Sequence, residues 1–449
     1  MNGPSHLRDS AVYGDLWADS QVREWFGEQS RTRCWSMILG WIALAQADIG
    51  AVPVPIAERI AQVCAGAEPP IEWIASRRVE SGHSSLGLIE WLQQEVGPTA
   101  SNYVAMATTV QDISDTWTAL AMRRVGTMVR IGLLDIRESL VSLAIEQRST
   151  PMLARTHGQP AVPTTLGWKA SSWGAEIDRH LTRFSQGADR WERCPLGGSV
   201  GTLAYWGTAA PALLAAFARR SGLPADVVPW GAARDCVAEF AGACALVTAT
   251  LARIGNEIYQ LQRPEIGEAV ESGDPRQIGS VTMPHKRNPE RSEHLVTLNT
   301  LVRGSATTLL TAMVGEHERD GRSWKTEWIA LPDLCCYASA SVGTAAALLR
   351  SVSFDTARMR ENVRARAREV FSEQRIRGAE PAHGYRDAYA GERSLLSAPM
   401  TAADSGHAED VAGRPDAVPP RNRDETAELE RALASAIALT DRWLRGRAG

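Results

Sequence analysis

Apolar residues recur in steps of three and four over long stretches of this chain. From residue 166 onward, the positions that share one face of a helix are Leu166, Ala170, Trp173, Ile177, Leu181 and Phe184. The same spacing predicts further helices over 112–147, 240–261, 290–315 and 332–351. No intervening segment alternates apolar and polar residues with the period of two typical of a strand. The pattern therefore predicts an all-α protein.

Several of the predicted helices exceed the usual length of a helix in a globular protein. Long helices with apolar stripes are typical of a bundle, and we expect association between chains to complete their burial. They define a central helix-bundle domain, 97–351. The segment 1–96 contains shorter helices separated by breaks such as AVPVP (51–55), which predicts an N-terminal helical cap domain.

The C-terminal part, 352–449, differs in composition from the rest of the chain. Between residues 376 and 425 it is rich in Gly, Pro, Ala and Asp and has little periodic apolar content, so we expect loose order there. A last helix is predicted at about Glu425 to Leu444. These features indicate an atypical, partly disordered C-terminal domain.

Composition narrows the class of partner. The net charge of −4 is spread over interspersed acids and bases, with no basic stripe for nucleic acid and no polybasic patch for a membrane surface. We find no apolar run of membrane-spanning length and no signal segment. Seven cysteines without C-x-x-C spacing indicate reduced thiols in a cytoplasmic protein. A small-molecule partner is the remaining expectation.

Three polar clusters lie near the ends of the predicted helices: ATTVQDISDT (107–116), ARTHGQPAVPTT (154–165) and GSVTMPHKRNPERSE (279–293). In the third cluster, Asn288 and Pro289 are typical of a helix cap and of the first helical position. The helix N-terminus, the Lys286 ammonium and the Asn288 amide together form a site for a carboxylate that accumulates negative charge. Lysine occurs at only three positions in the chain, so Lys286 is a specific signal.

These groups suit removal of a proton from the carbon beside a carboxylate. Ser280 could act as the base if Lys286 and nearby N–H groups stabilise its alkoxide. Histidine is the side chain suited to proton transfer near neutral pH, so His157 could protonate or polarise the group that leaves. The hydroxyl and amide groups of Thr109, Gln111 and Thr156 would bind the other carboxylate.

Structural interpretations of the same residues stay open. A single histidine in a loop is more often solvated or capping than catalytic, and this applies to His157 taken alone. GGSVGT (197–202) lacks the Lys of a phosphate loop and predicts a turn. No His, Cys and Asp spacing predicts a metal site.

Together the three clusters resemble the fumarase/aspartase superfamily, whose signature GSSxMPxKxNP is similar to GSVTMPHKRNP here. The resemblance covers roughly residues 10–375. It implies an all-α, three-domain fold and a homotetramer whose central helix bundle and active sites are shared between chains. It also implies reversible elimination from substituted succinates, usually with fumarate as product and without a metal or other cofactor.

The resemblance also implies roles for single residues. Ser280 matches the catalytic base, and His157 belongs to the Thr-His pair of the family. The implied substrate-binding residues are Thr109, Gln111, Thr156, Lys286, Asn288 and His83.

The chain is most similar to the branch of adenylosuccinate lyase and 3-carboxy-cis,cis-muconate cycloisomerase, through RTHGQPAVPTT, PHKRNP and PWGAARDCVAEFAG. It lacks the serine-rich nucleotide-binding stretch after ERD (318–320) and the helical continuation after Ser372 and Glu373. We therefore expect a lyase that releases fumarate and a nitrogen leaving group from a dicarboxylate of specialised metabolism, such as antibiotic biosynthesis, with nitrosuccinate favoured. The alternatives are the cycloisomerase, an adenylosuccinate lyase-like enzyme and an inactive structural relative. Arg179 and Arg303 are candidates for holding the leaving group.

Overall fold

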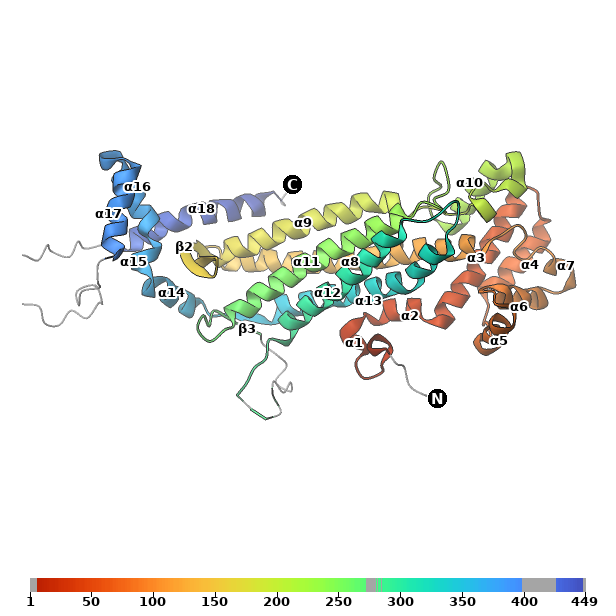
Figure 1. Cartoon of the computed structure of the whole chain (residues 1–449), viewed down its shortest axis with the longest axis horizontal. Coiled ribbons are helices and arrows are strands. Elements are labelled where there is room, and N and C mark those ends of the chain that lie inside the picture. Colours follow the sequence, from red (N-terminus) through yellow and green to blue (C-terminus); the bar gives the residue numbers. More distant parts are fainter. Residues whose placement is uncertain (1–5, 272–279, 281, 284, 398–424, 447–449) are drawn as a thin grey trace, which may run out of the picture. The chain divides into compact units, whose positions relative to one another are not determined.

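The computed structural model describes residues 6–271, 280, 282–283, 285–397 and 425–446. These residues are mostly helical, which confirms the predicted all-α class (Figure 1). The chain divides into two compact units. Unit 1 is Met1–Asp135, Ile177–Asn256 and Glu290–Ala347, and unit 2 is Ile136–Glu176, Glu257–Pro289 and Leu348–Gly449. Each unit combines segments of two predicted domains, and the three domain ranges stay a prediction.

Unit 1 begins with short helices that precede the long ones. They are α1 (Gly14–Trp17), α2 (Ser20–Phe26), α3 (Glu28–Asp48), α4 (Val54–Ala65), α5 (Ile71–Ser81), α6 (Leu86–Val96) and α7 (Pro98–Ser101), after a 3-10 turn at Leu7–Asp9. Helix α3 packs closely on α4 because Gly40 has no Cβ. A Cβ there would lie 3.0 Å from Cβ of Cys64 and 3.2 Å from Cα of Ala61. This close contact buries Ile38 and Ile42 in the cap.

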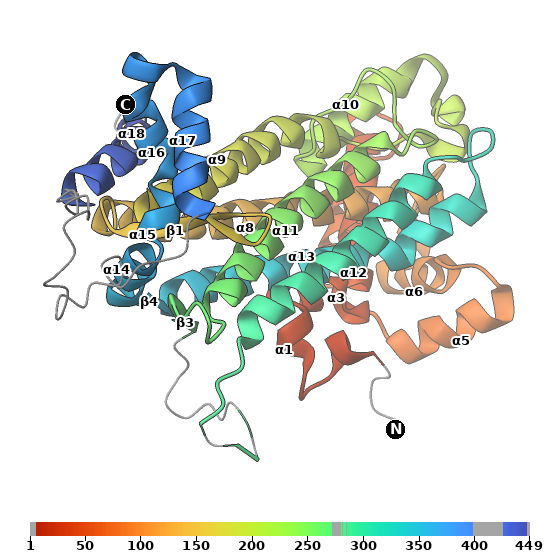
Figure 2. The ribbon, with the colours of Figure 1, turned by 60° about the vertical axis from the view of Figure 1, so that its left-hand side comes forward.

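The long helices form a bundle, as predicted. They are α8 (Val110–Glu146), α9 (Leu166–Trp191), α11 (Asp235–Leu261), α12 (Glu290–Ala312) and α13 (Gly321–Ser351). Within unit 1, parts of α8, α11, α12 and α13 run side by side in both views (Figures 1 and 2). The remaining elements of unit 1 are α10 (Ala210–Ser221) and 3-10 turns at Gly198–Val200 and Ala204–Ala209.

Aromatic packing fills the centre of the unit 1 bundle. The rings of Phe184 and Trp191 on α9 and Phe240 on α11 meet edge to face, with centroids 5.5 to 6.3 Å apart. All three side chains are buried. Edge-to-face contacts between buried rings stabilise a core beyond the area that they bury.

Helix α11 is an exception to the expectation that no apolar segment is long enough to span a membrane. By length and composition alone it could cross a membrane, since it has a window of mean hydropathy 1.5. However, 67% of that window is buried inside the structure. A buried core helix passes the same test, because its apolar residues are needed on several faces.

Unit 2 contains strands that the sequence pattern did not predict. Strand β1 (Pro151–Thr156) pairs antiparallel with β2 (Gln159–Thr165) in a hairpin, and β3 (Ala269–Glu271) pairs with β4 (Val352–Phe354). Pro160 and Pro163 interrupt the alternation of apolar and polar residues in β2. In β1, the register of the pairing shifts between Leu153 and Arg155. Prolines are tolerated in a two-stranded ribbon because each strand has an unpaired edge.

Unit 2 packs three of its helices, α14, α15 and α18, on this hairpin. Its helices are α14 (Thr356–Ala365), α15 (Ala367–Val370), α16 (Ser372–His383), α17 (Tyr385–Ser397) and α18 (Glu425–Arg445). One apolar cluster joins Met152 of β1 to Leu166, Leu261 and Met359. A second cluster joins Leu153 to Val363, Val370 and Phe371.

The expected loose order of 376–425 is wrong for its first part. Helices α16 and α17 pack against each other, as the paired blue helices of Figure 2 show. Arg375 of α16 donates hydrogen bonds to the buried Glu392 carboxylate of α17. This ion pair and the stripe of α17 that includes Ala388 stabilise the pair despite low apolar content. Residues 398–424 lie outside the described part of the chain, and α18 confirms the predicted last helix.

We expect Gly167→Ala to lower the free energy of unfolding by about 1 to 3 kcal/mol, as overpacking does. A Cβ at Gly167 on α9 would lie 2.7 to 2.9 Å from backbone atoms of Ala144, Gln147 and Arg148. The matched control is Gly391→Ala in α17, where no atom lies within 4 Å of the added Cβ. That change should raise stability by about 0.5 to 1 kcal/mol. Calorimetry at one protein concentration measures both, and equal unfolding temperatures for the two variants would contradict the packing.

Candidate active site

The first polar cluster lies at the N-terminus of α8. The N–H of Thr109 donates to Oδ2 of Asp112 at 2.9 Å, which resembles the reciprocal bond of a capping box. Oδ1 of Asp112 accepts from the N–H groups of Gly197 and Gly198, both at 2.9 Å. Burial raises the pKa of the Asp112 carboxyl, and these N–H groups oppose the rise. The GGSVGT segment, predicted as a turn, therefore anchors the start of α8.

The amide of Gln111 is held in one orientation. Its Nε2 donates to Oδ2 of Asp115 at 3.0 Å and to the carbonyl of Gly231 at 2.6 Å. Its Oε1 accepts from Nε of Arg319 at 2.6 Å. Because donor and acceptor sides are both engaged, the amide cannot flip without loss of hydrogen bonds.

Arg319 is the residue that sequence reasoning missed at this cluster. Its Nη1 donates to Oγ1 of Thr109 at 3.0 Å and its Nη2 to the carbonyl of Gly198 at 3.2 Å. It lies 208 residues from Gln111, so no local spacing connects them. The candidates Arg179 and Arg303 lie on α9 and α12 instead. The structure thus places a guanidinium beside two groups predicted to bind a carboxylate.

A buried ion network adjoins the first cluster at Asp115, which accepts from Gln111. Arg234 donates to both oxygens of Asp115, at 2.7 and 3.1 Å, and its Nε donates to Oε1 of Glu327 at 2.8 Å. Nε1 of Trp324 donates to the same Asp115 carboxylate at 3.2 Å. Burial works to lower the pKa of Arg234, but the two carboxylates outweigh it and raise the pKa. Burial also raises the pKa of Glu327, against the effect of Arg234.

The second cluster forms the tip of the β1–β2 hairpin. Thr156 ends β1, Gln159 begins β2, and the two residues between them have positive φ, 54° at His157 and 74° at Gly158. Two consecutive positive φ angles in a two-residue loop are typical of a type I′ turn. A positive φ at a non-glycine residue stores strain and is enriched at functional sites. Thr156 and His157 are both exposed, so the turn presents them outward.

Arg155 fixes the strand that carries this tip. Its Nη1 and Nη2 donate to the two oxygens of Glu268 at 2.9 and 2.7 Å. The Glu268 carboxylate is fully buried and also accepts from Nδ2 of Asn362 at 2.7 Å. A bidentate pair of this kind restricts the orientation of both side chains. The hairpin is therefore tied to the segment before β3 and to α14.

In unit 2, two hydrogen bonds on Met283 join the described residues Ser280 and Lys286 of the third cluster. Oγ of Ser280 accepts from the N–H of Met283 at 3.1 Å, and the N–H of Lys286 donates to the carbonyl of Met283 at 2.9 Å. Lys286 is exposed and Asn288 is half-buried. Helix α12 begins at Glu290, so the predicted cap at Asn288 is one residue early. Gly279 and Val281 of the signature lie outside the described residues.

His83 lies in the loop between α5 and α6. The backbone N–H of His83 donates to Oγ of Ser81 at 3.2 Å, and its ring Nδ1 accepts from the backbone N–H of Ser85 at 3.4 Å. His83 is exposed.

The structure brings the predicted residues together in three groups. Thr109 and Gln111 share Arg319 in unit 1. In unit 2, Thr156 and His157 share the hairpin turn, and Ser280 and Lys286 both bond to Met283. His83 lies apart in the cap loop of unit 1. Within the described ranges, no three His, Cys, Asp or Glu side chains group as metal ligands. All seven cysteines are buried free thiols, as expected.

Comparison with known proteins identifies the family. The profile of a family described as "Lyase" matches residues 17–304, more than half of the chain. The chain therefore belongs to this lyase family, within the fumarase/aspartase superfamily, and the resemblance of the motifs is confirmed.

The relatives differ in the reactions that their names describe. N-acetyl-S-(2-succino)cysteine lyase of Dickeya dadantii (strain 3937) is 36% identical over 80% of this chain and 79% of its own. Nitrosuccinate lyase of Streptomyces davaonensis is 32% identical over 90% of this chain and 87% of its own. The crystal structure of 3-carboxy-cis,cis-muconate lactonizing enzyme from Pseudomonas putida has a TM-score of 0.84, 27% identity and coverage of 97% of this chain and 98% of that one. The comparisons thus support a lyase and leave its substrate open.

We expect Arg234→Met to lower the free energy of unfolding by about 3 to 5 kcal/mol, because it leaves two buried carboxylates without a cation. Burial raises the pKa of the Glu327 carboxyl in the folded protein, so folding favours its protonated form. Stability is therefore lost as the pH rises above the ordinary pKa of a glutamate side chain. Removal of Arg234 raises the pKa of Glu327 further, so Arg234→Met should lose more stability at neutral pH than near pH 5.

Chemical denaturation across this pH range tests the expectation. The matched control is Arg190→Met, which removes an exposed pair with Glu239 and should cost at most about 1 kcal/mol. A loss for Arg234→Met that is equal to the control, or independent of pH, would contradict the network's role.

Proposed function

We propose that this lyase eliminates a substituent from a substituted succinate and releases fumarate. Ser280 removes a proton from the carbon beside one carboxylate, and the electrons of the C–H bond form the double bond as the substituent leaves with its own bonding pair. The observation that carries the proposal is the hydrogen bond from the Met283 N–H to Oγ of Ser280. A backbone donor on this oxygen stabilises the alkoxide that the base requires.

Substrate binding follows from the charges of the three clusters. Lys286 and Asn288 stabilise the carboxylate that gains charge when the proton is removed, near the N-terminus of α12. Thr109 and Arg319 hold the other carboxylate. Gln111, predicted to bind it, orients Arg319 instead, because its two amide hydrogens are donated to Asp115 and Gly231. From the hairpin tip, His157 acts at the leaving group and the hydroxyl of Thr156 binds a substrate carboxylate.

We further propose that the active site is completed by other copies of the chain, in a homotetramer. Two findings support this. Thr156 and His157 stand exposed on a strained turn, and the bundle helices of unit 1 expose large apolar side chains, among them Ile131, Leu246, Val296 and Leu310. Exposed apolar positions at helical spacing are typical of a surface that another chain covers.

For the leaving group we propose nitrite, from nitrosuccinate. The nitrosuccinate lyase relative matches 90% of this chain, against 80% for the succinocysteine lyase. Release of a thiol from a succinylated cysteine is the second candidate, favoured by the higher identity of 36%. The muconate lactonizing reaction is the third, supported by the similar fold.

A substrate comparison decides between these candidates. The purified protein is incubated separately with nitrosuccinate, N-acetyl-S-(2-succino)cysteine and 3-carboxy-cis,cis-muconate. Fumarate with equimolar nitrite is the expected result for the first. Fumarate with a free thiol from the second, or lactone from the third, without turnover of nitrosuccinate would replace the proposed substrate.

Ser280→Ala should lower kcat by about 100- to 10,000-fold, the range of a lost general base. The secondary structure and oligomeric state should stay unchanged, because Ser280 lies in a loop. Thr282→Ala is the matched control, since Thr282 is an exposed hydroxyl in the same segment. A near-normal rate for Ser280→Ala would show that another group is the base.

His157→Asn separates the chemistry of His157 from its backbone role. Asparagine is favoured in type I′ turns, so the hairpin should keep its shape. Nitrite is a good leaving group that needs no proton, so the rate with nitrosuccinate should fall by less than about tenfold, whereas a poorer leaving group should lose about 100-fold or more. Equal losses with both substrates would indicate that His157 orients the substrate instead.

A further inference from the structure

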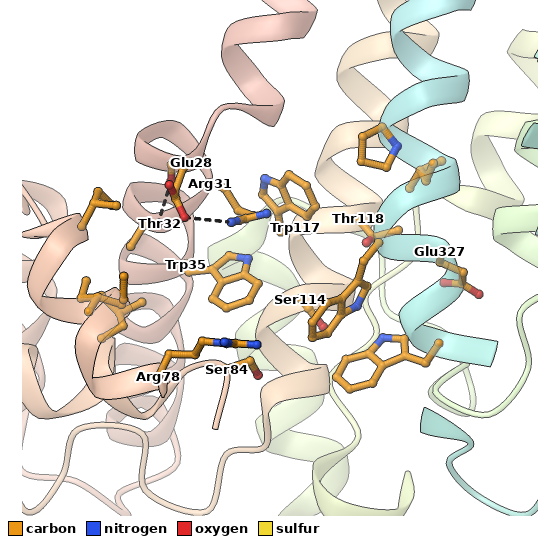
Figure 3. A pocket seen from close by; sticks show the side chains of 18 residues that line it. Glu28, Arg31, Thr32, Trp35, Arg78, Ser84, Ser114, Trp117, Thr118 and Glu327 are labelled. Atoms are coloured by element: carbon orange, nitrogen blue, oxygen red, sulfur yellow. Dashed lines mark hydrogen bonds and ion pairs between the residues drawn. The ribbon is translucent and has the colours of Figure 1, made fainter. Parts of the chain in front are cut away.

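Helix α3 approaches the start of α8 at two places in unit 1. Its first half lines, with α8 and α13, a cavity of about 260 Å³ that Ser84 and Ser114 also border (Figure 3). Ser84 follows His83, and Ser114 lies three residues beyond Gln111, so this cavity belongs to the candidate active site. The last turn of α3 carries Gln46, which is not one of the predicted site residues.

Gln46 is buried, and only one side of its amide is paired. The residue is 1% exposed, and its Nε2 donates to the carbonyl of Met106 at 2.8 Å. Its Oε1 is buried and has no donor within the described part of the chain. A buried acceptor without a donor lowers the free energy of unfolding, whereas an apolar side chain of similar size would not. Stability alone therefore does not explain a glutamine at this position.

The peptide that Gln46 contacts lies between two strained residues. Met106 is flanked by Ala105 and Ala107, whose φ angles are 58° and 52°. Residues other than glycine rarely adopt this left-handed conformation, and it persists only where the surrounding structure supports it. Inside the loop, Oγ1 of Thr108 donates to the same Met106 carbonyl at 3.3 Å. The bond from Gln46, 60 residues away in the chain, supports the loop from another helix.

The strained loop leads directly to the proposed carboxylate position. Thr109 lies three residues beyond Met106, and its hydroxyl accepts from Nη1 of Arg319 at 3.0 Å. The N–H of Thr109 donates to Oδ2 of Asp112, which fixes its backbone from the side of α8. A hydroxyl and a guanidinium bind one carboxylate only if both are correctly placed, because hydrogen bonds weaken steeply with distance and angle. A shift of the peptide at Met106 would therefore move the Thr109 hydroxyl away from this arrangement.

We propose that Gln46 is a positioning residue for substrate binding and that it acts through the Met106 carbonyl. It keeps the peptide between the two strained alanines in place and so sets the Thr109 hydroxyl against Arg319. The unpaired Oε1 is the stability that this role costs, a common exchange at functional positions. The inference rests on the proposed role of Thr109 and Arg319 in binding a substrate carboxylate.

Gln46→Leu separates positioning from stability. It removes the bond to Met106 and the unpaired acceptor together, so the unfolding temperature should change by less than about 3 °C. KM should rise about three- to tenfold with kcat within about twofold, as expected for loss of binding that ground state and transition state share. Hydrogen exchange over 102–109 should become faster by a similar factor, because the amides of Met106, Thr108 and Thr109 are hydrogen bonded there.

A glycine in the strained loop tests the route of the effect. Ala107→Gly relieves strain at a positive φ, so the loop then needs less support from Gln46. In the wild-type background it should leave KM within about twofold, whereas in the Gln46→Leu background it should lower KM at least about threefold. A general loss of packing at Gln46 would give no such rescue.

Gln29→Leu is the matched control, since Gln29 lies on the same helix, seventeen residues earlier, and donates to Glu68. With an active wild-type protein, the same KM in Gln46→Leu as in this control would overturn the inference. A rise in KM that Ala107→Gly does not reverse, or that appears only with a lower unfolding temperature, would also overturn it. Absence of turnover in the wild-type protein would instead contradict the proposed function. Hydrogen exchange needs no turnover, and unchanged exchange over 102–109 in Gln46→Leu would overturn the inference in either case.

Discussion

The arrangement of unit 1 depends on one buried cation. Arg234 precedes α11 and meets carboxylates from α8 and α13, so three segments distant in sequence are held at a single point. A buried charge without partners costs several kcal/mol, and the three segments therefore cannot separate without exposing or orphaning charge. Gln111 and Trp324 both donate to Asp115 and so take their positions from this contact. The polar groups at the start of α8 thus depend on one structural support.

Unit 2 positions its polar groups by a different principle. His157 is held on a two-residue turn with positive φ, and the strand before it is clamped by the pair of Arg155 and Glu268. Strain at a turn persists only when the surrounding structure compensates for it, and the clamp supplies that compensation. Ser280 receives its donor from a residue three positions later. Unit 2 therefore combines short-range geometry at His157 and Ser280 with a long-range ion pair behind the hairpin. In unit 1 the long-range ion pairs of Arg234 supply the main support.

Much of the fold could be predicted from local patterns. The stripes that begin at Leu166 and run through Phe240 repeat at helical spacing, and helices form where they predict. The hairpin was missed because Pro160 and Pro163 interrupt the alternation that indicates a strand. Helices α16 and α17 were missed because their pairing depends on Arg375 and Glu392, an ion pair between helices and not a periodic apolar stripe.

By itself, the sequence determined the class of the protein and the chemical groups of its three clusters. A signature such as GSVTMPHKRNP acts over a few residues, and hydrogen bonds within it, such as that between Met283 and Ser280, are local. Only the tertiary structure placed Arg319 on Thr109 and Gln111, and joined Asp115 and Glu327 through Arg234. These contacts join residues 93 to 210 positions apart along the chain. Which of many arginines meets which carboxylate is decided by the packing of whole helices, because no periodicity or spacing in the chain encodes that choice.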